Sequence, residues 1–275
     1  MPIQNSINTN IGAFVALQNL NAVNSRLDTV QNRVSTGLKV NNAVDDASSF
    51  AIAQGVRGNL KAFEAVSQGL ANGRGVAAVT LAGATAISDL LGDIQKKITE
   101  GQNAGNTTEQ QQILNADFLN LVSQINTFVT NATYNGRNLL SHLSTSINVI
   151  ANVDGTTLTI RSNSAFAQQS ANLGAQNLSS TIGAFKALSA LFNAQAMINQ
   201  VLGNLGADTR TLNNQDEFLS KLTDATKEGL GAIVDADMAK ESAKLQALQV
   251  QQQLSVQTLG IANQRPQTLL SLFRG

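Results

Sequence analysis

The side chains that most often carry catalysis or hold metal ions are scarce in this chain of 275 residues. Cysteine is absent, which excludes disulfides, thiolate nucleophiles and thiolate-bound metal sites. The single histidine, His142, follows a turn and lacks the second imidazole that a histidine metal pair or a two-histidine zinc helix requires. We therefore expect neither an enzyme nor a cofactor.

Two groups of carboxylates are the remaining candidates for divalent-metal chemistry. They are the pair Asp45-Asp46 and the closely spaced Asp235 and Asp237. Short acidic side chains are also preferred at helix N-termini, where they accept backbone hydrogen bonds and face the positive end of the helix dipole. No other carboxylate lies near Asp45-Asp46 in the sequence, so helix capping is the expected role, and the same interpretation is favoured for the second group.

Charge and composition restrict the partners. The chain has 18 basic and 18 acidic residues, and its formal net charge is zero. Without a basic excess or a basic block, binding to nucleic acid or to an anionic membrane surface is not expected. Aromatic residues make up only 4%, too few for the aromatic-lined pocket typical of small-molecule sites, whereas 43% hydrophobic residues allow extensive burial.

The proline positions and the hydrophobic period predict long helices. Between Pro2 and Pro266 there is no proline, and proline costs about 3 kcal/mol in a helix interior. Apolar residues recur every seven positions over 47–100 and again from 181 to 235, and in alternating steps of three and four over 108–132. A period of 3.5 residues held this long is typical of a coiled-coil seam. The seam residues are Val56, Phe63, Leu70, Leu91, Ile98, Leu114, Phe118, Leu121, Ile125, Leu191, Ile198, Leu205, Leu212 and Leu219.

The middle of the chain carries the one good strand signal. Ile147, Val149, Ala151 and Val153 alternate with other residues, and Asp154-Gly155 then predicts a two-residue hairpin turn. Residues 162–180 are rich in Ser, Asn, Gln and Ala and are expected to form a surface stretch. The predicted fold is mainly α: long antiparallel helical rods, a small β-hairpin, and paired N- and C-terminal helices.

Both ends of the chain are free of charge, over Met1–Ser25 and Leu245–Gln264. A signal peptide or a membrane span is not expected, since amide side chains interrupt both stretches. Each large apolar side chain contributes about 1.5–3 kcal/mol on full burial, while ordering costs about 1–2 kcal/mol per residue for the backbone. We therefore expect the ends to be disordered in the monomer and to become ordered when several copies pack around them. The residues expected at this interface are Ile3, Ile7, Ile11, Phe14, Leu17, Leu20, Leu254, Leu259, Leu269, Leu272 and Phe273.

Several short motifs at the two ends resemble those of bacterial flagellin. They cover roughly the first 140 and the last 95 positions, in the order found in that family. The motifs are Ser6–Asn10, Val34–Val40, Ala43–Ala47 with Ala51–Ala53 and Arg57, Tyr134–Gly136, Asp235–Ser242, and Gln257 with Ala262–Gln264, Pro266 and Leu269–Phe273.

The resemblance implies a subunit that polymerises into the extracellular flagellar filament used for swimming. It also implies secretion through the flagellar type III export apparatus, an export chaperone, and assembly beneath a filament cap on hook-associated proteins. The alternative is a hook–filament junction protein, which shares similar ends. A third class, an amphipathic-helix protein coating lipid or granules, would require basic residues beside the apolar faces, and the uncharged ends lack them.

The resemblance further implies two layers called D0 and D1, without outer D2 and D3 domains. The expected parts are the D0 N-terminal helix and spoke at 1–40, the D1 N-terminal helices at 41–140, the hairpin and surface segment at 141–180, the D1 C-terminal helix at 181–235 and the D0 C-terminal helix at 236–275.

Two family properties depend on surface residues of D1. Flagellins detected by the innate immune receptor TLR5 carry a basic patch near the segment Leu91–Glu100. Here Asp93, Gln95, Lys96 and Lys97 do not reproduce that patch, which argues against recognition by TLR5. Many flagellins also carry O-linked sugars on exposed hydroxyl groups. The candidates by expected exposure are Thr156, Ser162, Ser164 and Ser170.

Overall fold

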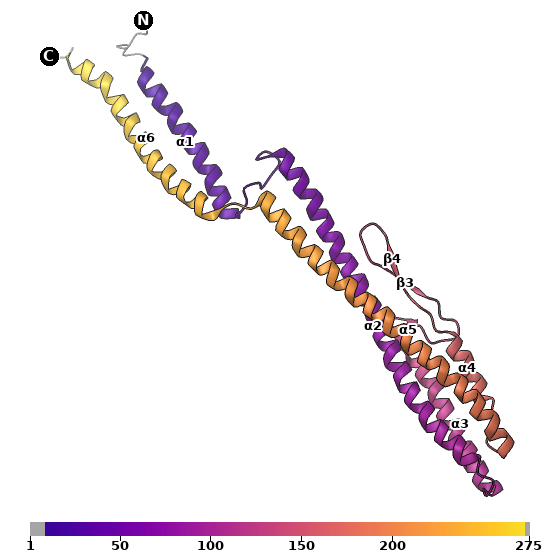
Figure 1. Cartoon of the computed structure of the whole chain (residues 1–275). Coiled ribbons are helices and arrows are strands. Elements are labelled where there is room, and N and C mark those ends of the chain that lie inside the picture. Colours follow the sequence, from indigo (N-terminus) through magenta and orange to yellow (C-terminus); the bar gives the residue numbers. More distant parts are fainter. Residues whose placement is uncertain (1–8, 273–275) are drawn as a thin grey trace. The chain divides into compact units, whose positions relative to one another are not determined.

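The structure is a computed structural model that describes the backbone of residues 9–272 and the side chains of residues 9–264. The described chain is mostly helical, with two small antiparallel hairpins (Figure 1). The elements are α1 (Ile11–Thr36), α2 (Ala47–Gly101), α3 (Thr108–Asn131), β1 (Thr133–Tyr134), β2 (Arg137–Asn138), β3 (Ile147–Ile150), β4 (Thr157–Ile160), α4 (Ala165–Gly174), α5 (Thr181–Val234) and α6 (Met238–Leu272). The predicted fold class is confirmed.

The chain divides into two compact units. The terminal unit comprises the described parts of Met1–Gly58 and Ala225–Gly275, and the central unit comprises Asn59–Asp224. Helices α2 and α5 each contribute residues to both units. These boundaries differ from the expected borders at residues 40 and 235, so the division into D0 and D1 stays a prediction.

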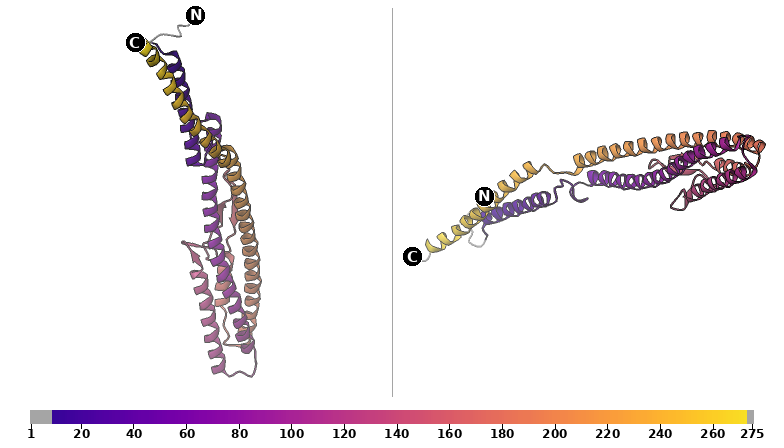
Figure 2. Two further views of the ribbon diagram at one scale, coloured as in Figure 1. Left: turned by 90° about the vertical axis from the view of Figure 1, so that its left-hand side faces the viewer. Right: turned by 90° about the horizontal axis from the view of Figure 1, so that it is seen from below.

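In the central unit, α2 and α5 run antiparallel, and both views of Figure 2 show them side by side. Two contacts fix their register: Arg74 Nη1 donates to Asp216 Oδ2 at 2.8 Å, and Gln195 Nε2 donates to Gln95 Oε1 at 3.0 Å. The core between the helices contains the fully buried Leu70. A window of α2 is apolar enough to cross a membrane by length and composition, with a mean hydropathy of 1.5. Its apolar side chains form this core, so α2 is the core helix of a helical bundle.

Helix α3 starts with a capping box. The Thr107 hydroxyl accepts from the Gln110 backbone N–H, and the Gln110 side chain accepts from the Thr107 N–H. A turn follows α3, with positive φ angles of 48° at Asn135 and 73° at Gly136, and it joins β1 to β2.

Strands β3 and β4 pair in the register Ile147↔Ile160 to Ile150↔Thr157. The predicted two-residue turn at Asp154-Gly155 was wrong. The turn spans Asn152 to Gly155 instead, with Gly155 N–H donating to the Asn152 carbonyl at 3.1 Å and a φ of 82° at Gly155. As a result, Val153 lies in the turn and is exposed rather than on the buried face with Val149.

The expected surface stretch at 162–180 was wrong. Its first half forms α4, whose Phe166 and Leu173 are fully buried, and Leu178 beyond the helix is buried as well. Leu178 N–H donates to Asn115 Oδ1 of α3 at 2.8 Å, which ties the segment to the central unit. The apolar residues recur at a helical spacing within a polar composition, so a few side chains are enough to hold the segment against α3 and α5.

In the terminal unit, α1 and α6 pack along each other (Figure 1). Gly37 ends α1 in the left-handed conformation, with a φ of 73°. Backbone bonds then join the two connecting segments: Lys39 N–H donates to the Val234 carbonyl at 2.7 Å, and Ala236 N–H donates to the Gly37 carbonyl at 2.9 Å. A small core of Val40, Ala53 and Val234 lies beneath this junction.

Candidate assembly interface

Polar contacts hold α1 and α6 in an antiparallel register. Asn10 Nδ2 donates to the Ala262 carbonyl at 2.7 Å, and Gln252 Nε2 donates to Asn24 Oδ1 at 2.8 Å. These bonds join positions 252 and 228 residues apart in the sequence. Because Asn10 Oδ1 also accepts from Ala13 N–H at 3.1 Å, one amide side chain both caps α1 and anchors α6.

The end of the helix pair nearest the connecting segments carries a buried carboxylate. Glu241 is 6% exposed, and its Oε1 lies 2.6 Å from Lys244 Nζ and 4.0 Å from Arg33 Nη1. Two cations from two helices therefore compensate one buried negative charge. This arrangement satisfies the requirement that a buried charge be paired.

The inner face of α1 buries little apolar surface. Only Ala16 and Val30 are buried among its residues. At about 100° per residue, Ile11, Phe14 and Leu17 point away from the Ala16 side of the helix. They are 47%, 63% and 43% exposed, respectively. Three large apolar side chains that face outward from the uncharged first part of α1 indicate a surface that another protein covers.

Helix α6 presents apolar side chains on more than one side. Val250, Leu254 and Ile261 fall within about 40° of one another around the helix, whereas Val256 lies on a different side. All four are more than half exposed. Among the described residues α6 packs along α1, and these four side chains remain exposed. Exposed apolar side chains on more than one side of a helix indicate that further elements can cover it.

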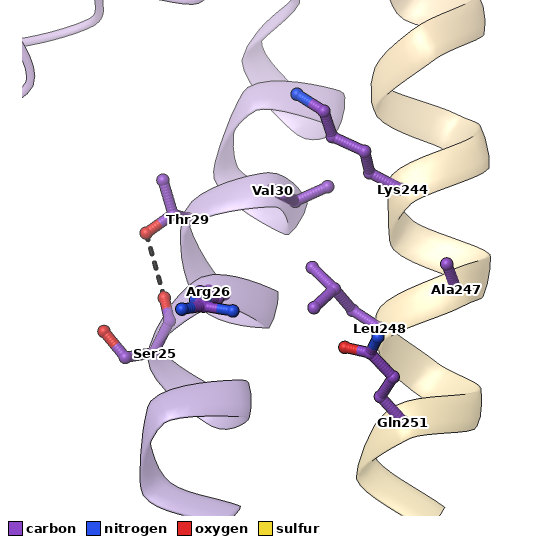
Figure 3. Close-up of a pocket in the computed structure, with 8 residues that line it drawn as sticks. All are labelled: Ser25, Arg26, Thr29, Val30, Lys244, Ala247, Leu248 and Gln251. Carbon is purple, nitrogen blue, oxygen red and sulfur yellow. Dashed lines mark hydrogen bonds between the residues drawn. The ribbon is translucent and has the colours of Figure 1, made fainter. Parts of the chain in front are cut away.

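A groove of about 430 Å³ lies between the two helices (Figure 3). Figure 3 shows the side chains of Leu248 from α6 and Val30 from α1 pointing into the space between the helices. Arg26 and Lys244 place cationic groups at its border. The residues lining it are Ser25, Arg26, Thr29, Val30, Lys244, Ala247, Leu248 and Gln251. The groove thus continues the uncovered apolar surface along the pair.

The interface residues predicted from the sequence fall into three groups. Ile11, Phe14, Leu17 and Leu254 are exposed, and Leu20 and Leu259 are half-buried. Ile3, Ile7 and Phe273, and the side chains of Leu269 and Leu272, lie outside the described residues. The prediction missed the exposed Val15, Val250, Val256 and Ile261, which the same absence of charge could have indicated.

The seam residues lie at the centre of the bundle with three exceptions. Val56 is half-buried and belongs to the terminal unit, and Leu114 and Leu121 are half-buried in α3. The buried ones are Phe63, Leu70, Leu91, Ile98, Phe118, Ile125, Leu191, Ile198, Leu205, Leu212 and Leu219. The buried seam residues thus belong to the packed core of the central unit, and the seam does not extend as a buried core into the terminal unit.

The candidate metal carboxylates bind backbone groups. Asp46 Oδ1 accepts from the N–H groups of Ser48 and Ser49 at the start of α2, and Asp237 Oδ1 accepts from Lys240 N–H at the start of α6. Asp45 Oδ2 accepts from two backbone N–H groups of its own loop. Among the described residues no group of three or more His, Cys, Asp or Glu side chains gathers around a possible metal position.

The hydroxyl candidates for O-linked sugars differ in exposure. Thr156 is exposed, whereas Ser162 and Ser164 are half-buried, and Ser162 Oγ lies 2.7 Å from Ser144 Oγ. The expected exposure of Ser170 was wrong: it is 2% exposed, and its hydroxyl donates to the Ala167 carbonyl at 2.9 Å. The cause is α4, which places Ser170 on the face that packs against α3.

These features define a mainly helical protein whose terminal helices present an uncovered apolar surface. Comparison with known proteins identifies the family. Residues 7–145 match the bacterial flagellin N-terminal helical region, and residues 188–273 match the bacterial flagellin C-terminal helical region. The chain therefore belongs to the flagellin family.

Individual relatives agree over nearly the full length. Flagellin FljK of Caulobacter vibrioides is 37% identical over 270 residues, which cover 98% of this chain and 99% of that protein. A flagellin of Brucella melitensis is 37% identical over 288 residues, with the same coverage of both chains. The structural alignment with the crystal structure of Bacillus cereus flagellin covers 55% of this chain and 88% of the Bacillus cereus chain, with 17% sequence identity and a TM-score of 0.49.

Proposed function

We propose that this chain is a structural subunit of a bacterial flagellar filament, and that it polymerises by burying the outer faces of α1 and α6 against other copies. Membership of the flagellin family supports the filament, and the matched relatives are flagellins rather than hook-associated proteins. The observation that carries the mechanism is the exposure of Phe14 and Leu254 on the uncharged segments of two paired helices.

The absence of charge on part of each helix suits enclosure by several neighbours. A charged side chain buried without a partner is strongly unfavourable, so a surface that is covered on all sides excludes unpaired charges. Residues 11–25 and 245–264 contain no charged side chain, and the amides of Asn10, Asn24 and Gln252 are used to join the two helices. Neighbouring copies would then meet an uncharged surface of apolar and amide side chains.

The wider biology follows from the family as part of the proposal. The subunit is secreted through the flagellar type III apparatus with an export chaperone, and it assembles outside the cell beneath a filament cap on hook-associated proteins. O-linked sugars, where present, attach to the exposed Thr156 in preference to the half-buried Ser162 and Ser164.

Recognition by TLR5 is not part of the proposal. Lys97 is engaged within the chain, because its Nζ lies 3.4 Å from Glu100 and 3.2 Å from Asp117. Hydrogen bonds to Asp117 and to Glu100 raise the pKa of Lys97 above its ordinary value. The pairing of Lys97 with two carboxylates reduces the free positive charge on this part of α2, where Lys96 is the other cation.

Point substitutions on the two helices test the mechanism. Phe14→Asp and Leu254→Asp place a charge in the proposed interface, and we expect neither variant to polymerise on salting out. Phe14→Leu and Leu254→Ile keep an apolar side chain and should still form filaments. Polymerisation is measured by sedimentation and electron microscopy, and circular dichroism checks that the central unit stays helical.

Deletion of residues 1–20 or 254–275 should have the same effect as the aspartate substitutions. Normal filaments from either deletion, or from both aspartate variants, would contradict the proposed role of these helices.

A further inference from the structure

A second apolar surface lies on the central unit. At the start of α5, Ile182, Phe185 and Phe192 are 72%, 58% and 53% exposed, respectively. Phe185 and Phe192 are seven residues apart and therefore share one face of the helix. We call Ile182, Phe185 and Phe192 the α5 stripe.

The same unit contains an apolar groove of about 380 Å³ between α2 and the two hairpins. Its floor is formed on α2 by Val66, Gly73 and Val76, and its walls by Tyr134 and by strand β3 from Ile147 to Ile150. We call this site the hairpin groove. Its border carries the amide of Asn72 and the guanidinium of Arg137.

Two glycines allow the walls of the groove to approach α2. A Cβ atom at Gly73 would lie 2.7 Å from Val149 Cγ2, and one at Gly75 would lie 2.7 Å from Tyr134 Cζ. Both distances are shorter than real Cβ contacts, so the shape of the groove depends on glycine at both positions. The hairpin groove is thus defined by rigid elements: a helix, a strand and an aromatic ring.

The α5 stripe and the hairpin groove cannot meet within one copy. The contacts Gln95–Gln195 and Arg74–Asp216 place the groove residues of α2 level with residues near 216 of α5. Phe192 lies about 24 residues from that point, or roughly 36 Å at 1.5 Å per residue. Figure 1 likewise shows the start of α5 beside α4, with the β3–β4 hairpin further along α5.

We propose that the α5 stripe of one copy packs into the hairpin groove of a second copy, with Phe192 as the central side chain. This inference rests on the proposed filament function and adds a specific contact to it. Two different apolar surfaces that meet head to tail form a heterologous contact, which propagates into an open assembly when the rotation does not close a ring. Each copy then both offers a stripe and receives one.

The small area of the stripe favours a tethered second copy as the occupant. The charged residue nearest to Phe192 along α5 is Lys186, six positions away, so Phe192 itself brings no charge near Arg137. Each stripe residue has roughly 100 Å² left to bury, since large aromatic side chains bury about 150–250 Å² in full.

The stripe therefore supplies about 300 Å², well below the roughly 800 Å² per partner of a standard stable interface. A separate partner would not be held by so small a surface. A copy already tethered through α1 and α6 would be, because tethering raises its effective concentration at the second contact.

The cysteine-free sequence makes the contact testable by cross-linking. One variant carries Ser189→Cys, an exposed position between Phe185 and Phe192, and the other carries Asn72→Cys at the border of the groove. The two are mixed, polymerised and treated with a short bismaleimide. We expect a covalent dimer from the mixture and from neither variant alone.

The matched control is Ser220→Cys, an exposed serine on the same helix outside the stripe, mixed with Asn72→Cys. Absence of the Ser189–Asn72 dimer in filaments that form normally would overturn the contact, and so would an equal yield from the Ser220 mixture. Failure of the unmodified protein to form filaments would instead contradict the proposed function.

A second measurement does not depend on cross-linking. Phe192→Ser should raise the critical concentration for filament growth roughly tenfold, as expected for a central interface residue. Phe218→Ser, on the same helix and 57% exposed, should leave it nearly unchanged. Equal effects of the two substitutions would overturn the inference.

Discussion

At the scale of single residues, Asp46 and Asp237 act as helix caps. Asp46 accepts hydrogen bonds from the Ser49 hydroxyl at 2.7 Å and from the N–H groups of Ser49 and Ser48. These bonds hold the pKa of Asp46 below its ordinary value of 3.8, because they stabilise the ionised carboxylate, and the bond from the Ser49 side chain has the largest effect. The start of α2 is therefore coupled to pH.

The sign of this coupling gives a prediction. A carboxylate whose pKa is lower in the folded state stabilises the fold above its unfolded pKa, and this contribution is lost as the pH falls through the folded value. We expect the difference in thermal stability between the unmodified protein and Asp46→Ala to be constant above about pH 5 and to shrink below pH 3.8.

Thermal unfolding at several pH values measures this difference. Asp45→Ala is the control, since Asp45 binds N–H groups of its loop instead of α2. A difference for Asp46→Ala that stays constant down to pH 2 would contradict the capping role.

At the scale of elements, two glycines of α2 have different roles: one allows close packing, and the other only lowers the stability of the helix. Gly73 and Gly92 both lie within α2, but a Cβ at Gly92 would have no neighbour within 4 Å, whereas one at Gly73 would collide with Val149. Replacing a helix glycine by alanine gains about 0.5–1 kcal/mol when space is available.

We expect Gly92→Ala to raise the free energy of unfolding by about that amount. Gly73→Ala should lower it by about 1–3 kcal/mol, because the added methyl group forces the hairpin outward. Urea denaturation of the monomer measures both. Equal stabilisation by the two substitutions would show that the β3–β4 hairpin does not pack on α2 as described.

The elements that the sequence predicted well are those with strong local signals. The expected helix over 47–100 corresponds to α2, because Asp46 and the unbroken seven-residue period mark its start and its buried face. Helix α4 was missed because only Phe166 and Leu173 carry its burial within a polar stretch. The turn of the β3–β4 hairpin was misplaced because Asp154-Gly155 is a strong local signal, whereas the register is set by packing of Val149 and Ile160 near Gly73.

The assembly surface was predictable in location but not in detail. The uncharged ends indicated α1 and α6. The sequence alone could not show which side of each helix is covered by the other helix. Val250 and Ile261 are of residue types common in cores, but the structure shows that α1 does not cover them. The α5 stripe was not predicted, since Phe185 and Phe192 lie beside seam residues and their exposure depends on where α2 and α4 pack.

At the scale of the whole molecule, the two units differ in how much apolar surface each buries by itself. The central unit has a continuous buried core of its own. The terminal unit has a small core at Val40, Ala53 and Val234, and its helices bury only Ala16 and Val30 from α1. Local stability follows buried apolar contact, so α1 and α6 should open more easily than α2 and α5 in the free protein.

Amide hydrogen exchange, compared between the dilute monomer and the filament, tests this central claim most directly. We predict that amides of residues 11–36 and 238–264 exchange at least about a hundredfold faster in the monomer than in the filament, while those around Leu91 and Leu205 are protected in both. Protection of α1 and α6 in the monomer equal to that of the central unit would contradict the claim that other copies stabilise these helices.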